Sequence, residues 1–140
     1  MRLQGDRGAA STELAVLTPL LIGFMLFAVY AGRVAQTQGD VTHAAYEAAR
    51  SASLTGHPTA AEAAAHQTAS DNIAAGVACR DLTVVVDTTS FTAGGRVGVT
   101  VTCEASYADL ALLAVPGSRT FIATAVEVID VHRADQEPHP

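Results

Sequence analysis

The sequence predicts an α+β protein with a long N-terminal helix, membrane-spanning and then amphipathic, and a second helix. Both pack on a small antiparallel sheet of about three to four strands. Three observations predict this fold. Residues 14–31 are 18 uncharged, mostly apolar residues, the lower end of the length that spans a bilayer. Helical, alanine-rich sequence then continues to about residue 75, and strand-like alternation of apolar and polar residues begins at residue 82.

The apolar segment follows a short leader that contains Arg2 and Arg7. Counted from Ala9, the helix is 23 residues long, or about 35 Å at the helical rise per residue. Basic residues before the segment favour a cytoplasmic N-terminus and an exterior location for residues 33–140. Pro19 lies inside the segment and has no N–H, so we expect it to bend or loosen the helix there.

These features divide the chain into four expected parts. They are a cytoplasmic leader at 1–8, a transmembrane helix at 9–31, an extracytoplasmic domain at 32–131 and a disordered polar tail at 132–140. The sequence beyond Ala31, tail included, contains six Arg against twelve Asp and Glu, which accounts for the whole net charge of −6.

Beyond the membrane, helix is expected to continue to about Leu54. A weak apolar stripe runs along this part of the chain at helical spacing, made of Val34, Val41, Ala45, Ala48 and Ala52. Residues 56–58, Gly-His-Pro, should end the helix. Thr59 and Glu62 have the spacing of a capping box, which predicts a second helix that starts at Thr59 and runs to about Ala75, before Gly76.

Strands are expected at residues 82–87, 96–103 and 121–129, with residues 92–95 as the first turn. Residues 110–113, Leu-Ala-Leu-Leu, fit either a strand or a short helix.

Cys79 and Cys103 are the two cysteines. A disulfide between them is the first expectation for an exterior domain, and two buried thiols are the alternative. Both residues lie equally far from a turn centred near Phe91, but pairing them directly would set the valines of one strand opposite non-valine residues. Either a bulge shifts the register, or Cys79 lies before its strand and reaches Cys103 from there.

The charge and the side-chain chemistry exclude several function classes. Without a basic patch, the chain is not expected to bind nucleic acid. His43 and Glu47 are one helical turn apart, but two side chains do not close a metal site. We find no nucleophile motif and no glycine-rich phosphate loop, so we expect no catalysis, no metal and no cofactor.

The most informative residues are Gly8 and Glu13, five positions apart at the start of the apolar segment. A carboxylate there has no purpose in an isolated anchor, and a charge is unfavourable in lipid. Cleavage after Gly8 would create a cationic amine on Ala9. Glu13 of a neighbouring subunit could pair with that amine in a bundle of helices, which would make both charges acceptable and fix the axial register.

Three fates of the N-terminus therefore compete. The first is cleavage between Gly8 and Ala9, which retains the helix in a polymerising subunit. The second is an uncleaved single-pass anchor whose exterior domain binds or senses a ligand. The third is release of a secreted domain after Ala31, where residues 29–31 tolerably match a signal-peptide site, although the apolar core is long for a signal peptide.

Residues 7–21 resemble the N-terminal signature of TadE-like proteins, which are pilin-like minor subunits (pseudopilins) of the tight-adherence, or Flp-type, pilus system. The family pattern is Arg-Gly, small residues, Val-Glu-Phe-Ala, and then a short apolar step to Pro and a Leu-rich run. This chain retains Gly8, Glu13 and Pro19, and it departs from the pattern at Thr12, Leu14 and Thr18. Residues 44–52 resemble the family's Ala- and Arg-rich helix after the membrane, so the resemblance covers about the first 53 residues.

The resemblance implies a structural role in pilus assembly and a pilin-like fold. It implies that a prepilin peptidase cuts between Gly8 and Ala9, and that the partners are other pilin-like subunits, the assembly machinery and membrane lipid. The expected location is the cell membrane, with the C-terminal domain outside and a possible place in a surface pilus.

Overall fold

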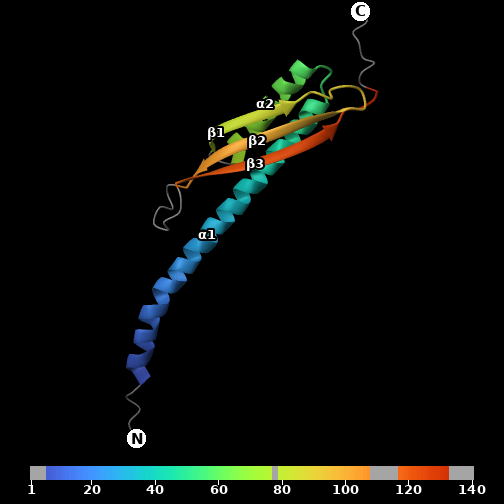
Figure 1. Cartoon of the computed structure of the whole chain (residues 1–140). Coiled ribbons are helices and arrows are strands. Elements are labelled where there is room, and N and C mark those ends of the chain that lie inside the picture. The colour runs from blue at the N-terminus through green and yellow to red at the C-terminus, as the bar shows by residue number, and fades with distance from the viewer. Residues whose placement is uncertain (1–5, 77–78, 108–116, 133–140) are drawn as a thin grey trace, which may run out of the picture. The chain divides into compact units, whose positions relative to one another are not determined.

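The computed structural model describes residues 6–76, 79–107 and 117–132, with side chains from Leu14 on. Two helices precede three strands: α1 (Asp6–Ser53), α2 (Pro58–Gly76), β1 (Cys79–Asp87), β2 (Arg96–Ser106) and β3 (Ser118–Val128) (Figure 1). The expected α+β arrangement is confirmed, with three strands in the described part of the chain. The segment 110–113 and the tail 133–140 lie outside the described residues.

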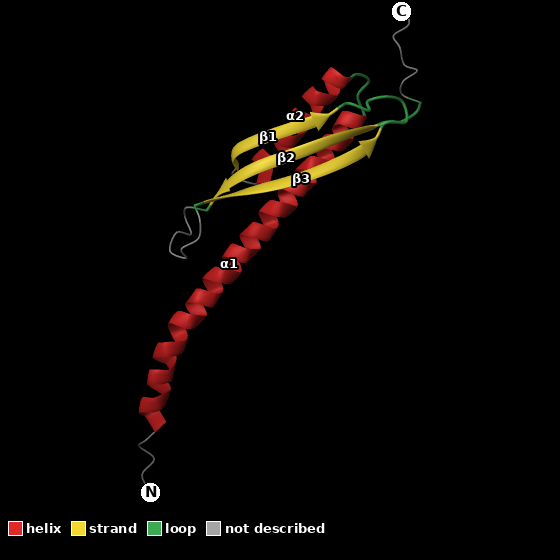
Figure 2. Cartoon of the chain, viewed as in Figure 1, coloured by secondary structure: helices red, strands yellow, loops and turns green. Residues whose placement is uncertain are grey.

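The chain divides into two compact units, Met1–Val34 and Ala35–Pro140. The described part of the first unit is the N-terminal part of α1, which is helical through Pro19. The second unit contains the rest of α1, α2 and the sheet. Figure 2 shows that α2 lies with this part of α1 behind one face of the sheet.

Alanine dominates the helical side of the core in the second unit. The predicted stripe of α1 is confirmed for Val41, Ala45, Ala48 and Ala52, which are fully buried, whereas Val34 is only half-buried. In α2 the buried residues recur every four positions: Ala61, Ala65, Ala69 and Ile73. Small side chains let helix backbones approach closely, so a core with little aromatic content can still be closely packed.

The start of α2 differs from the prediction. The helix begins at Pro58, and the backbone N–H of Ala61 donates to the carbonyl of His57 at 2.9 Å. Thr59 is therefore inside the first turn, and the capping box predicted for Thr59 and Glu62 is wrong. Proline is favoured at the first helical position because its missing N–H would have no partner in the helix anyway.

The sheet is antiparallel, with strand order β1-β2-β3. The inward side chains of the central strand β2 are Val97, Val99, Val101, Cys103 and Ala105, all buried. Val84 of β1 lies opposite Val101, and Phe121 of β3 lies opposite Cys103. The apolar alternation thus selects the face that packs on the helices.

A disulfide joins Cys79 and Cys103, whose Cα atoms are 5.5 Å apart. The register places Leu82, not Cys79, opposite Cys103, and it shifts between Cys79 and Asp81. The first alternative, a bulge, is therefore confirmed. With this bulge, the valines of β1 and β2 lie opposite one another while Cys79 reaches diagonally to Cys103. The symmetric register, in which Cys79 would lie directly opposite Cys103, is wrong.

The connection between β1 and β2 is an eight-residue loop at 88–95, longer than the turn predicted at 92–95. The backbone N–H groups of Gly95 and Arg96 donate to Thr92 and Ser90 carbonyls at 2.7 and 3.1 Å. The loop also joins the end of β3, because Gly94 donates to the carbonyl of Ile129 and Ile129 donates to that of Gly95. Gly94 has φ of 72°, a backbone conformation that favours glycine.

Candidate functional site

The candidate site is the N-terminal part of α1. The backbone of Gly8, Ala9 and Glu13 is helical, within the α1 span that starts at Asp6. The proposed cleavage position and the carboxylate thus lie on one continuous helix, less than two turns apart. No break separates them from the apolar segment that follows.

The apolar segment exposes its large side chains. Eleven large apolar residues from Leu14 to Val29 are exposed, and among them Leu14, Val16, Leu20, Phe24 and Met25 are each more than 60% exposed. Among the described residues, one helical span, Leu14–Ser53 of α1, is long and apolar enough to cross a membrane. A helix that is hydrophobic all round and unburied requires lipid or other helices around it.

Pro19 lies within α1 and does not end it. Because proline has no N–H, the carbonyl of Ala15 loses its usual helical donor. The hydroxyl group of Thr18, the residue before Pro19, donates to the carbonyl of Leu14 at 2.6 Å, four residues earlier in the helix. Threonine hydroxyl groups satisfy backbone carbonyls of membrane helices in this way.

Among the described residues, there is no group of three or more His, Cys, Asp or Glu side chains that could hold a metal ion. His43 and Glu47 form the pair expected from their spacing, with Nε2 and Oε1 4.0 Å apart. Both side chains are about half or more exposed.

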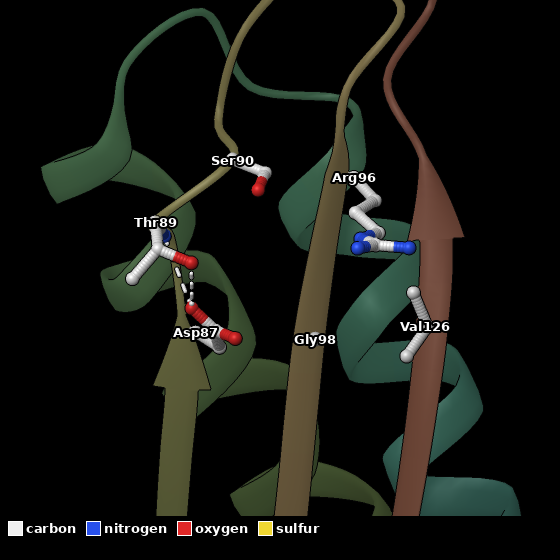
Figure 3. Close-up of a pocket in the computed structure, with 6 residues that line it drawn as sticks. All are labelled: Asp87, Thr89, Ser90, Arg96, Gly98 and Val126. Carbon is white, nitrogen blue, oxygen red and sulfur yellow. Dashed lines mark hydrogen bonds between the residues drawn. The ribbon is translucent and has the colours of Figure 1, made fainter.

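Sequence reasoning missed a polar hollow on the sheet (Figure 3). It has a volume of about 110 Å³ and is lined by Asp87, Thr89, Ser90, Arg96, Gly98 and Val126. The Thr89 hydroxyl and backbone N–H donate to Asp87 Oδ1 at 2.7 and 3.0 Å. These hydrogen bonds, and more weakly the charge of Arg96, hold the pKa of Asp87 below its ordinary value of 3.8. No sequence motif indicated this hollow, because three strands have to be in register to form it.

Sequence reasoning also missed a buried contact between α1 and the end of β2. The hydroxyl groups of Thr37 and Tyr107 are 3.0 Å apart and buried, although 70 residues separate them. In addition, the Gln38 carboxamide donates to the carbonyl of Ile122 in β3 at 3.4 Å. These bonds connect the part of α1 that follows the apolar segment to the sheet.

Comparison with known proteins bears on the N-terminal part of the chain. Residues 8–50 match the family model described as TadE-like protein. The match begins at Gly8 and ends three residues before the end of α1. No curated protein and no solved structure matches the chain. Over residues 8–50, this chain is therefore similar to the TadE-like family.

Proposed function

We propose that this protein is a minor pilin-like subunit that contributes to the assembly of a tight-adherence, or Flp-type, pilus. The observation that carries the proposal is the family match over residues 8–50, which coincides with a continuous helix exposing an apolar surface. Such a surface can be shared between lipid before assembly and neighbouring helices after it. The role is structural, as is typical of TadE-like pilin proteins.

The N-terminus of the mature subunit is Ala9 in this proposal. A prepilin peptidase cuts the bond after Gly8 on the cytoplasmic side, and the new amine carries a positive charge at neutral pH. Residues 9–11, Ala-Ala-Ser, are small and allow helices to approach closely in this region.

Glu13 pairs with the Ala9 amine of a neighbouring subunit. An unpaired carboxylate costs roughly 2.5–3.5 kcal/mol near the centre of a membrane helix and less at its edge. Pairing offsets this cost only if both charges are present, because a single buried charge is strongly unfavourable. The pair therefore couples processing to assembly: without the new amine, Glu13 has no partner.

The domain beyond the helix lies outside the cytoplasm, and the N-terminal leader lies inside. The disulfide between Cys79 and Cys103 supports this placement, since disulfides persist in oxidising compartments. Arg2 and Arg7 before the apolar segment support it independently. Pilus subunits and the assembly machinery are the partners.

Substitution of Glu13 tests the proposal. Glu13→Gln keeps the size of the side chain and removes its charge, and Glu13→Val also removes its polarity. Both variants should insert in the membrane, because a neutral side chain is easier to place there, and both should be lost from sheared pilus fractions. Glu62→Gln, on an exposed position of α2, is the matched control. Incorporation of Glu13→Gln at the level of the unmodified protein would show that the pairing role is wrong.

A further inference from the structure

The second unit of the chain contains two groups of elements that are held together in different ways. Side-chain hydrogen bonds connect α1 to β3 and to the end of β2. The hydroxyl groups of Thr37 and Tyr107 are 3.0 Å apart, and the Gln38 carboxamide donates to the carbonyl of Ile122 at 3.4 Å. Tyr107 directly follows β2, and Ile122 belongs to β3. Thus α1, β2 and β3 form one group, and α2 and β1 remain as the other.

Among the described residues, no side chain of α2 forms a hydrogen bond or an ion pair with α1 or with the sheet. The side-chain hydrogen bonds of α2 stay within the helix, from Gln67 to Asp71 and from Asn72 to the carbonyl of Thr68. The buried face of α2 consists of three alanines and one isoleucine: Ala61, Ala65, Ala69 and Ile73. Apolar packing therefore holds the helix on the domain, and each alanine contributes a single methyl group to it.

The contact between α2 and α1 is open at one end and unfavourable at the other. A surface hollow of about 430 Å³ lies between the helices, with Arg50 of α1 and Ala64 and Thr68 of α2 among the residues that line it. At the far end of α2, a Cβ atom on Gly76 would be 3.3 Å from Oδ2 of Asp40. This oxygen is buried and has no hydrogen-bond partner. A buried acceptor without a partner retains its desolvation cost, so the contact opposes the docking of α2.

The strand β1 lies at the edge of the sheet and adds little to the core. Val84 is its one buried residue, whereas β2 in the centre has five. The helix α2 packs on β1, and two residues separate the end of α2 from the start of β1. We therefore treat residues 58–76 and 79–87 together as the α2–β1 unit.

One covalent bond ties the α2–β1 unit to the centre of the sheet. Cys79, the first residue of β1, is bonded to Cys103, which is fully buried on the inner face of β2. The regular register of the two strands begins only after the bulge, at Asp81. While the bond is intact, neither the start of β1 nor the end of α2, three residues earlier, can leave the sheet.

We propose that this disulfide is a redox latch: when it is reduced, the α2–β1 unit opens from the domain while α1, β2 and β3 stay folded. The inference goes beyond the proposed function and does not depend on cleavage after Gly8. Thiols persist in the cytoplasm and disulfides outside it. Under the exterior placement proposed above, the unit is therefore unlatched in the newly made chain and latched after export.

Reduction starts at Cys79, because Cys103 has no exposed surface and Cys79 is half-buried. A thiolate of a dithiol reagent bonds to the Cys79 sulfur, and Cys103 leaves as a thiolate that takes up a proton. The reagent's second thiolate then attacks the reagent's own sulfur in the mixed disulfide, which releases Cys79 as a thiol and leaves the reagent as a cyclic disulfide. Two electrons pass to the protein. Outside the cytoplasm, an oxidised thiol–disulfide exchange protein accepts the same two electrons when the latch closes.

Hydrogen exchange of the full chain in lipid vesicles, followed by mass spectrometry, tests the latch. The quantity compared is the exchange rate in peptides of the α2–β1 unit divided by the rate in peptides of β3. Dithiothreitol should raise this ratio at least ten-fold, because the unit then opens locally, whereas β3 opens only when the whole domain unfolds. An unchanged ratio, or a loss of protection throughout the domain, would overturn the proposal.

Trypsin gives a second measurement at two matched arginines. Arg80 in β1 and Arg119 in β3 are both exposed within a strand, so cleavage after either requires that strand to open. Reduction should raise the rate of cleavage after Arg80 at least ten-fold relative to cleavage after Arg119. An equal increase at both arginines would contradict the latch.

Tyr107→Phe in the oxidised protein is the matched control, because it weakens the group formed by α1, β2 and β3 and leaves the disulfide intact. Both ratios should stay within two-fold of those of the unmodified protein. A rise equal to that caused by reduction would show that the ratios report general destabilisation, and the latch would be wrong. None of these measurements involves the leader or Glu13, so their outcome is separate from that of the pilus-assembly test.

Discussion

The hydroxyl groups of Thr37 and Tyr107 lie 3.0 Å apart in the core, where they connect α1 to the residue that follows β2. A buried hydroxyl that loses its partner retains its desolvation cost. Tyr107→Phe and Thr37→Val should each lower the free energy of unfolding by about 1–2 kcal/mol. The double variant should lose less than the sum of the two, with a coupling of about 1 kcal/mol. Chemical denaturation of the four proteins measures this cycle, and additive losses would show that the contact contributes nothing.

The disulfide between Cys79 and Cys103 closes a loop across the β1–β2 hairpin with a sequence separation of 24. Loop-closure entropy predicts a stabilisation of roughly 3 kcal/mol for a loop of this length. We expect the paired variant Cys79→Ala/Cys103→Ala to unfold at lower denaturant concentration by that amount, and reduction of the unmodified protein to have the same effect. A reducing agent that leaves the unfolding midpoint unchanged would contradict this expectation.

Gly95 is required by close contact in the β1–β2 loop. A Cβ atom there would overlap the backbone carbonyl oxygen of Ser90. Gly95→Ala should therefore destabilise the domain by roughly 1–3 kcal/mol, because backbone must shift to admit the methyl group. Gly56→Ala is the matched control, since no atom lies within 4 Å of a Cβ at that position. Thermal unfolding should separate the two variants, and an equal effect of both would exclude the steric account.

Asp87 should titrate below its ordinary pKa of 3.8, because hydrogen bonds from Thr89 favour the charged carboxylate. A lowered folded-state pKa contributes stability that is fully present above the unfolded-state value and is lost as the pH falls through the folded-state value. The carboxyl ¹³C shift of Asp87, followed by NMR from pH 6 to pH 2, measures the pKa directly. Thr89→Ala should move it upward towards 3.8, and an unchanged pKa in that variant would assign the shift to another cause.

The sequence predicted well those features that depend on local periodicity. The apolar run and the alanine stripe predicted α1, and the alternation in β2 predicted the buried valines, because side-chain direction follows directly from helix and strand geometry. Gly8 and Glu13 could be singled out because a charge at the edge of an apolar helix is unusual in itself.

Features that depend on long-range register could not be predicted. The register between β1 and β2 shifts at the bulge between Cys79 and Asp81, and a symmetric hairpin has no such shift. The bond between Thr37 and Tyr107 joins residues with no local relationship. Even the start of α2 was misplaced, since both Pro58 and Thr59 carry valid start signals and only the folded context selects between them.

The central claim is that the subunit is cut after Gly8 and keeps its whole membrane helix. Intact-mass measurement of the protein purified from cells with an active prepilin peptidase tests this most directly. The proposal predicts a mature chain that begins at Ala9. A chain that still begins at Met1, or one that begins at Gly32, would contradict it.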